Sequence, residues 1–188
     1  MPAARKPVAE AAVGRLVALR PPRPDDRAAW CALVKASRPF FADWVSTRST
    51  APTFRAYLTR SRTPAAACRL IHQRADGALL GAINLTGIVR GMFQSGCLGY
   101  YVGASYAGQG YMTEALQLML RTAFRGLRLH RVEANIQPGN RASIALVERA
   151  GLRREGYSRR YLKIAGRWRD HERWALLAEE WRPRGRRG

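Results

Sequence analysis

The segment at residues 105–112 combines the residue types that most directly suggest chemistry. It reads Ser-Tyr-Ala-Gly-Gln-Gly-Tyr-Met and follows a strand-like run at residues 98–102. Glycines let a backbone approach a ligand closely, and the free N–H groups at the start of a helix point at an anion. The segment therefore predicts a turn that binds phosphate. A turn that only joins a strand to a helix is the alternative.

A helix is expected directly after this turn, because apolar residues recur there at the spacing of one buried helix face. The turn is not a Walker A loop, since no Lys followed by Ser or Thr comes after the glycines. It also lacks the third glycine of the dinucleotide fingerprint, whose place is taken by Thr113. The apolar residues of the expected helix are Met112, Ala115, Leu116, Met119, Leu120, Ala123 and Phe124.

A second motif begins about 20 residues after the glycine turn. Residues 130–136 alternate like a strand, and a Gln-Pro-Gly turn follows them. Asn140 is a favourable N-cap for a helix over residues 141–150, and Gly151 is a favourable stop for that helix.

Together the two motifs resemble those of the GNAT superfamily of N-acetyltransferases. The shared pattern is Y-x-G-x-G-[YIL]-[MA]-x-E-A-L, followed by N-x-x-S-x-x-x-x-x-x-x-G-[FL]. Within the superfamily the chain is similar to the RimJ/RimL branch, the ribosomal-protein-alanine acetyltransferases, and residues 155–171 are particularly close to RimJ. The resemblance covers roughly residues 14–181. It implies an α/β (α+β) fold in which helices flank a mixed, mostly antiparallel sheet.

The resemblance also implies which residues hold acetyl-CoA. Backbone N–H groups of the glycine turn would hold the pyrophosphate, and the end of the preceding strand would contact the pantetheine and the thioester. Ser105 stands where the family usually has Arg or Gln, which weakens a side-chain role there and leaves the backbone role intact. The residues expected to bind the cofactor are Tyr100, Tyr101, Val102, Ala107, Gly108, Gln109, Gly110, Tyr111, Met112, Asn140 and Ser143.

Three residues are candidates for catalysis. By resemblance, Ser143 would give a proton to the CoA thiolate; a plain hydroxyl in the first turn of a helix is the alternative. The glutamate that acts as general base in RimL would fall near Leu162, which cannot accept a proton. Glu133 and Asp170 are therefore candidates for the base, with ion pairing in an arginine-rich chain as the alternative for each.

A strong base is not required if the acceptor is an N-terminal amine. An α-amine has a pKa of about 7.7–8.0 and is partly neutral at pH 7, whereas a lysine amine near about 10.4 needs more help. The lack of an evident base therefore favours N-terminal over lysine acceptors. A covalent route through Cys97 would need an activating histidine beside it. No metal is expected, because the three histidines show no ligand spacing.

The charge of the chain allows two interpretations. The formal net charge is +20, from 33 basic and 13 acidic residues. A basic surface favours anionic partners, so contact with a ribosome or RNA is one interpretation. The arginines are spread along the sequence, however, and a compositional bias with a solvated charged surface is the other.

Length and composition predict one domain. Residues 1–12 are expected to form a flexible arm, residues 13–181 a single acetyltransferase domain, and residues 182–188 a basic disordered tail. The longest apolar run, at residues 78–89, is too short to span a bilayer, and no signal peptide is evident. The three cysteines fit no disulfide framework. A cytoplasmic monomer or homodimer without membrane contact is expected.

The remaining elements follow from local patterns. A strand is expected at residues 15–20, and helices at residues 25–37 and 53–62. Residues 66–74 and 79–89 form a predicted hairpin around an Asp-Gly turn, and residues 153–164 and 167–178 form another. Three tryptophans are expected to pack in the core or on that last hairpin, namely Trp168, Trp174 and Trp181.

The function predicted from these observations is acetyl transfer from acetyl-CoA to the N-terminal α-amine of a protein. By resemblance the acceptor is a ribosomal protein that begins with alanine, and the amine attacks directly in a ternary complex. One alternative keeps the fold and changes the acceptor to a small amine or an antibiotic. Another is a non-catalytic module that binds acyl-CoA or associates with ribosomes or RNA.

Overall fold

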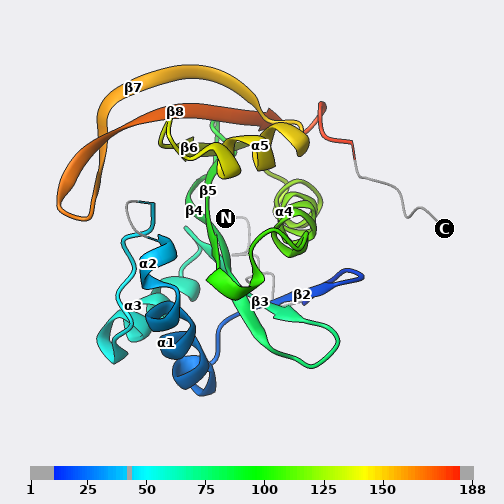
Figure 1. The fold of residues 1–188 in the computed structure, drawn as a ribbon. Helices are drawn as coiled ribbons and strands as arrows, with labels where there is room; N and C mark the ends of the chain where they lie inside the picture. The colour runs from blue at the N-terminus through cyan, green and yellow to red at the C-terminus, as the bar shows by residue number, and fades with distance from the viewer. Residues whose placement is uncertain (1–10, 42–43, 183–188) are drawn as a thin grey trace.

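An eight-stranded sheet forms the centre of the protein (Figure 1). The computed structural model describes residues 11–41 and 44–182. The spatial order of the strands is β1-β2-β3-β4-β5-β6-β8-β7, and neighbours are antiparallel except for β5 and β6. The strands are β1 (Ala12–Val13), β2 (Val17–Arg20), β3 (Ala67–Gln73), β4 (Leu79–Val89), β5 (Ser95–Val102), β6 (Arg131–Ile136), β7 (Arg153–Ile164) and β8 (Arg167–Leu177).

Helices cover both faces of this sheet, which confirms the predicted fold class. Figure 1 shows α1, α2 and α3 gathered on one side and α4 and α5 on the other. Each side buries its own apolar cluster: Leu116 and Met119 belong to the cluster beneath α4, and Trp30 and Phe54 belong to the one beneath α1 and α3. The helices are α1 (Arg27–Ala36), α2 (Arg38–Phe41), α3 (Ala51–Ser61), α4 (Tyr111–Arg121) and α5 (Arg141–Arg149).

Several helices differ from their predicted bounds for local reasons. Helix α1 begins at Arg27, two residues after its predicted start, because a short 3₁₀ turn over Pro24–Asp26 precedes it. Helix α3 begins at Ala51, two residues before its predicted start, because the Thr50 hydroxyl caps it by accepting from the backbone N–H of Thr53 at 3.4 Å. The chain then leaves the α geometry after α4 and continues as a π turn over Thr122–Gly126. The predicted apolar face nevertheless extends through this turn, where Ala123 and Phe124 are buried.

The parallel pair β5–β6 separates part of the way along its length. Its register runs from Ser95 opposite Arg131 to Leu98 opposite Ala134. Beyond Leu98, β5 stays paired with β4 as far as Val102, while β6 continues beside β8. Residues 99–102 of β5 therefore have no β6 partner on that side, and the sheet is split at this point.

The C-terminal hairpin of β7 and β8 is long and arches away from the rest of the sheet (Figure 1). Register shifts in β7 give the hairpin its bends, and Arg160 at one of them has a positive φ of 47°. Trp174 and Trp181 are buried as predicted, but Trp168 near the tip is 60% exposed. Trp168 therefore lies on the hairpin and outside the core, because this end of the hairpin extends past the helices.

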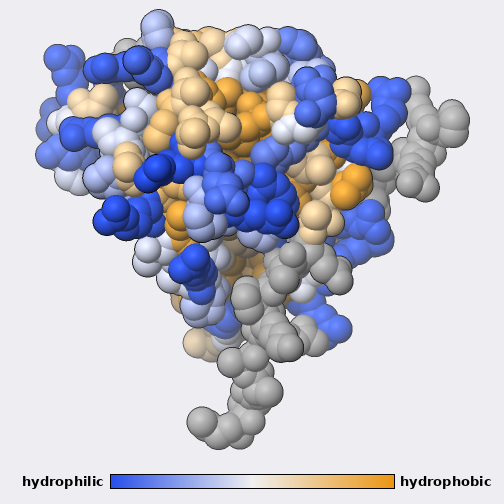
Figure 2. All heavy atoms as spheres, turned by 90° about the horizontal axis from the view of Figure 1, so that it is seen from below, coloured by the Kyte–Doolittle hydropathy of each residue, from blue (hydrophilic) through white to orange (hydrophobic). Residues whose placement is uncertain are grey.

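The termini and the surface bear on the remaining expectations. Most of the predicted N-terminal arm and nearly all of the predicted tail lie outside the described residues; of the arm, Ala12 pairs with Leu19. Within the described ranges no helix combines the length and the hydropathy needed to cross a membrane. Figure 2 shows one face of the molecule, on which strongly hydrophilic side chains are scattered among apolar ones.

Candidate functional site

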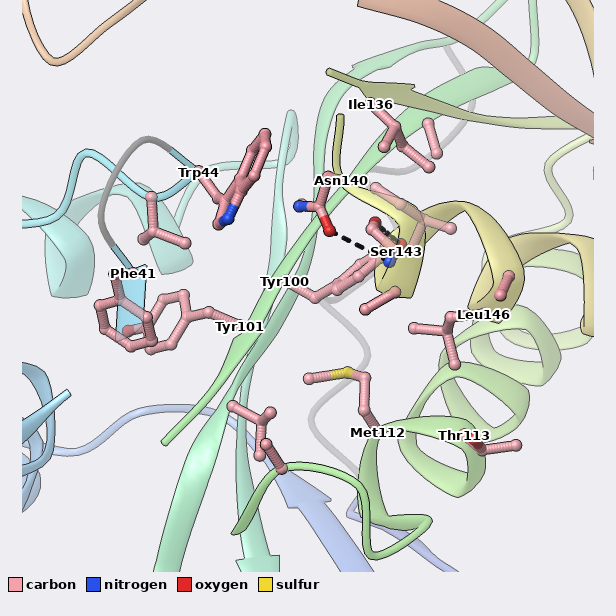
Figure 3. A pocket seen from close by; sticks show the side chains of 18 of the residues that line it. Phe41, Trp44, Tyr100, Tyr101, Met112, Thr113, Ile136, Asn140, Ser143 and Leu146 are labelled. Atoms are coloured by element: carbon pink, nitrogen blue, oxygen red, sulfur yellow. Dashed lines mark hydrogen bonds between the residues drawn. The ribbon is translucent and has the colours of Figure 1, made fainter. Parts of the chain in front are cut away.

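A cavity of about 700 Å³ opens where β5 and β6 separate (Figure 3). Residues 98–102 of β5 line it, together with the end of β6, the glycine turn before α4 and the first turn of α5. On the other side of the sheet it extends to α2 and the residues that follow α2. The volume is within the range of about 300–1,000 Å³ that is usual for small-molecule and cofactor sites.

The glycine turn is built to present backbone N–H groups. Gly108 and Gly110 have positive φ angles of 76° and 84°, a conformation that other residues adopt only with strain. Gly110 is the N-cap of α4 and offers no side chain to its first turn, so the N–H groups of that turn have no intrahelical or capping partner. A helix N-terminus left open in this way favours an anion.

The structure places nearly all of the predicted cofactor-binding residues on this cavity. The exception is Gln109, whose side chain turns back and donates to the carbonyl of Ser105 at 2.7 Å. That hydrogen bond stabilises the turn, and the side chain of Gln109 stays out of the cavity. The predicted residues that line the cavity are Tyr100, Tyr101, Val102, Ala107, Gly108, Gly110, Tyr111, Met112, Asn140 and Ser143.

A hydroxyl pair joins β5 to α5 across the cavity. The hydroxyl oxygens of Tyr100 and Ser143 lie 2.7 Å apart and share a hydrogen bond. Asn140 caps α5, because its side-chain oxygen accepts from the backbone N–H of Ser143 at 3.1 Å (Figure 3). Burial raises the pKa of Tyr100 to about 12, against the opposing effect of its hydrogen bond with Ser143. The tyrosine is therefore protonated at neutral pH and can donate to Ser143.

An aromatic wall closes the cavity on the side of α1–α3. The ring of Tyr101 lies 5.2 Å from the ring of Phe41, and its hydroxyl accepts from Trp30 at 2.7 Å. Trp44 projects toward the cavity from the segment after α2 (Figure 3). The sequence analysis did not identify Phe41 or Trp44. The only sequence signal for them was that aromatic residues follow a predicted helix, and that signal is weak.

The two candidate bases lie away from the cavity. Glu133 accepts from the Arg131 guanidinium at 2.6 Å. Asp170 accepts from the Tyr157 hydroxyl at 2.6 Å and from the backbone N–H of Arg160 at 2.7 Å, and these bonds hold the pKa of Asp170 below its usual value. Both carboxylates thus bond to groups of the sheet and its hairpin, and neither lies beside Ser143.

His171 on β8 lines the cavity, although the sequence analysis gave it no role in the reaction. It is only 3% exposed, and its Nδ1 lies 3.0 Å from the carbonyl oxygen of Arg169. Burial lowers the pKa of His171, while the Arg169 carbonyl and the charge of Asp170 act in the opposite direction. The sequence alone could not identify His171 as a cavity residue, because its place beside the cavity depends on the position of β8 in the sheet.

Cys97 lies on β5 close to the split, and its surroundings do not activate it. The side-chain N–H of Asn135 donates to its sulfur at 3.2 Å. Burial and the nearby Glu133 raise the pKa of the thiol, although the hydrogen bonds from Asn135 act to lower it. The thiol is therefore protonated at neutral pH, which does not suit a nucleophile.

Comparisons with known proteins agree with this architecture. The model of the acetyltransferase (GNAT) domain family matches residues 16–153. The solved structure of Mycobacterium smegmatis RimJ in complex with CoA-disulfide is 30% identical, with a TM-score of 0.85, over 92% of this chain and 90% of that one. The ribosomal-protein-S5-alanine acetyltransferase of Vibrio fischeri has a TM-score of 0.82 at 22% identity, over 93% of this chain and 100% of that one, and shows a shared fold.

Curated relatives match over a shorter stretch. The [ribosomal protein uS5]-alanine N-acetyltransferase of Escherichia coli is 41% identical over 105 residues, which are 56% of this chain and 54% of that protein. The probable N-acetyltransferase YjcK of Bacillus subtilis is 40% identical over 107 residues, which are 57% of this chain and 59% of that protein. The matched part thus spans little more than half the length of these relatives. With the family model matching most of the chain, this protein belongs to the acetyltransferase (GNAT) family and resembles its RimJ/RimL branch.

Proposed function

We propose that this protein transfers an acetyl group from acetyl-CoA to the N-terminal α-amine of a protein, and that its acceptor is a ribosomal protein beginning with alanine. The observation that carries the proposal is the split between β5 and β6, which has an open helix N-terminus at one end and a hydroxyl pair inside it. The family supports acetyl-CoA as the donor. The names of the E. coli and V. fischeri relatives support the acceptor.

The donor would bind along the unpaired edge of β5. Residues 99–102 keep backbone groups free on the side of β6, and an extended pantetheine amide chain can bond to them as an added strand does. The N–H groups of the glycine turn and of the first turn of α4 would hold the pyrophosphate. Arg149 of α5 lines the same cavity and adds positive charge there.

The hydroxyl pair then acts on the leaving group. The amine attacks the thioester carbonyl, a C–N bond forms, and the C–S bond breaks with its electron pair going to sulfur. If Tyr100 donates to Ser143, the proton of Ser143 remains free to pass to the thiolate. The amine loses one proton and the thiolate gains one. Solvent can therefore return a proton to Ser143, and the reaction releases no net proton. The position of Cys97 and the raised pKa of its thiol favour this direct transfer over a covalent intermediate.

The acceptor side of the cavity favours an amine that carries little extra positive charge. Among the described residues that line the cavity there is no carboxylate, and the wall is formed by Phe41, Trp44 and Tyr101. A polyamine or an aminoglycoside would bring several positive charges to this wall without a counter-charge. An α-amine at a chain terminus can enter in its neutral form, because its pKa is about 7.7–8.0.

A test is to measure CoA release from acetyl-CoA with peptides beginning with Ala, Ser or Met, a lysine peptide with a blocked N-terminus, and small polyamines. We expect turnover with the peptide that begins with alanine and little or none with the lysine peptide. Turnover with small amines alone would reassign the acceptor. CoA binding without turnover on any of these acceptors would contradict catalysis and support a module that binds acyl-CoA.

A further inference from the structure

We propose that His171 is the general base that takes the proton from the attacking amine. The role rests on the acetyl transfer proposed above and supplies the group that neither Glu133 nor Asp170 can provide from its position. His171 borders the cavity, whereas those two carboxylates are bonded to groups of the sheet and its hairpin.

The hydrogen bond of the ring fixes which nitrogen can accept a proton. A carbonyl oxygen only accepts, so the contact of 3.0 Å between Nδ1 and the Arg169 carbonyl requires a hydrogen on Nδ1. In the neutral ring Nε2 then carries the free electron pair. A neutral imidazole in this tautomer is prepared to accept a proton from an amine.

His171 lies on the acceptor side of the sheet. Ala134 and Ile136 of β6 pack in the cluster with α4 and α5, and Ile136 is paired with Glu172 of β8. Successive side chains of a strand point to opposite faces, so His171, next to Glu172, points to the face that α1–α3 cover. This is the face of Tyr101 and Phe41, opposite the hydroxyl pair of Tyr100 and Ser143. Acetyl transfer through the split in the sheet requires a base on one face and a proton donor on the other.

The groups around His171 keep it neutral. Burial is the largest influence and lowers its pKa. Asp170, its neighbour on β8, opposes burial, whereas Arg169 and Arg173, two positions from the histidine on the same strand, are positively charged. Strand β7 contributes the uncharged Tyr161 ring, at 6.1 Å, and Ser158 as the paired residue. The nearby end of β6 contributes Asn135 and Gln137, which are also uncharged.

The decisive measurement is the pH dependence of kcat/KM with a peptide that begins with alanine. If two groups must both be neutral, the amine and His171, then log kcat/KM rises with a slope approaching two at the acidic end of the profile. The amine alone gives a slope of one. A slope of one in the unmodified protein would overturn the role of His171 and leave the proposed function intact. Absence of any turnover would overturn both.

The variant His171→Gln then assigns the second group. We expect kcat/KM at neutral pH to fall about 10²–10⁴-fold, the usual contribution of general acid–base catalysis. The slope should become one, and the Kd for CoA should stay within about twofold, because the ring lies opposite the hydroxyl pair. His130→Gln is the matched control, since His130 is exposed and borders no part of the cavity.

Two further outcomes would overturn the assignment. His171→Gln could retain both the rate and the slope of two. Alternatively, Asp43→Asn, a change outside the described residues but next to Trp44 in the sequence, could remove the second slope while His171→Gln keeps it. Should His171→Gln fail to fold, His171→Ala assayed with added imidazole supplies the test, because a missing base is restored by the free base and lost packing is not.

Discussion

At the scale of single residues, the site depends on a few hydrogen bonds that hold side chains in defined orientations. Tyr100 is partly buried and protonated, and its bond to Ser143 joins β5 to α5. Asn140 fixes the backbone at Ser143 by capping the helix. The serine is therefore oriented from both sides, which is the condition for directing its proton to one place in the cavity.

Replacing Ser143 with alanine should lower kcat about 10–100-fold and leave the KM for acetyl-CoA nearly unchanged, because a hydroxyl that acts on the leaving group matters mainly in the transition state. Tyr100→Phe should give a smaller loss, since Ser143 keeps its proton and loses only its orientation. Steady-state kinetics at saturating acceptor would measure both. Ser61→Ala on α3 is the control, and an unchanged kcat in Ser143→Ala would contradict the role.

Asp26 is a buried carboxylate whose stabilising effect should depend on pH. It accepts from both guanidinium nitrogens of Arg20, at 2.8 and 2.5 Å, and from the backbone N–H of Arg23 at 2.6 Å. Burial acts to raise its pKa, but these bonds outweigh burial and lower it. A lowered pKa stabilises the fold above the unfolded-state value of about 3.9, and the effect is lost as the pH falls through the folded-state value.

Asp26→Asn should therefore lower the free energy of unfolding by about 1–3 kcal/mol at pH 7. The difference from the unmodified protein should shrink as the pH falls below about 4 and through the lowered folded-state pKa, because the carboxylate is then protonated in both states. Urea unfolding at a series of pH values would measure it. Asp25→Asn changes the exposed neighbour and should have little effect at any pH, and a gap that did not vary with pH would contradict the linkage.

At the scale of elements, Glu114 fastens the first strands to the helix that begins at the glycine turn. Its carboxylate accepts from three consecutive backbone N–H groups, those of Arg15, Leu16 and Val17, at 2.7, 2.7 and 2.8 Å. Gly14 lies so close that an added Cβ would meet the carboxyl carbon at 2.5 Å. The turn between β1 and β2 is thus fitted around one side chain of α4.

Glu114→Gln should lower the free energy of unfolding by about 1–3 kcal/mol, because an amide offers one acceptor oxygen and turns a donor toward backbone N–H groups. Denaturant unfolding would measure the loss. The matched control is Glu148→Gln on the exposed side of α5, which should be neutral within about 0.5 kcal/mol. Equal effects of the two changes would show that the three bonds to Glu114 contribute no net stability.

The elements also show what could be predicted from the sequence and what could not. The glycine turn, the cap at Asn140 and the hairpins depend on neighbouring residues, so local patterns indicated them. The other wall of the cavity depends on distant contacts. His171 reaches it only because β8 inserts between β6 and β7, and Phe41 only because its ring packs against that of Tyr101. The exposure of Trp168 depends on the same kind of distant contact, since hydrophobicity alone does not show where a hairpin extends past the helices.

At the scale of the whole molecule, the net charge of +20 should influence which acceptors are acetylated quickly. A strongly positive protein attracts anionic partners over distances of about one Debye length, some 10 Å at 0.1 M salt. The hairpin residues between Ser158 and Asp170 reinforce this field near the cavity, because their five charged side chains are all basic: Arg159, Arg160, Lys163, Arg167 and Arg169.

Peptides that begin with alanine and continue with acidic residues should therefore have a kcat/KM about tenfold higher than matched basic peptides at low salt. The difference should fall toward unity near 1 M salt, where screening is nearly complete. Kinetics at several salt concentrations would measure it. A preference that persisted at high salt would instead indicate a specific contact, and no preference would mean that the charge acts only as a solvated surface.

The split in the sheet has a consequence for timing in the cell. The hydroxyl pair and His171 lie on opposite faces of the sheet, so the nucleotide and the polypeptide would approach from different directions. An extended chain advances about 3.3 Å per residue, and only its first few residues have to enter. A terminus that projects a short way from a finished, folded body should thus be accessible, and modification need not coincide with translation.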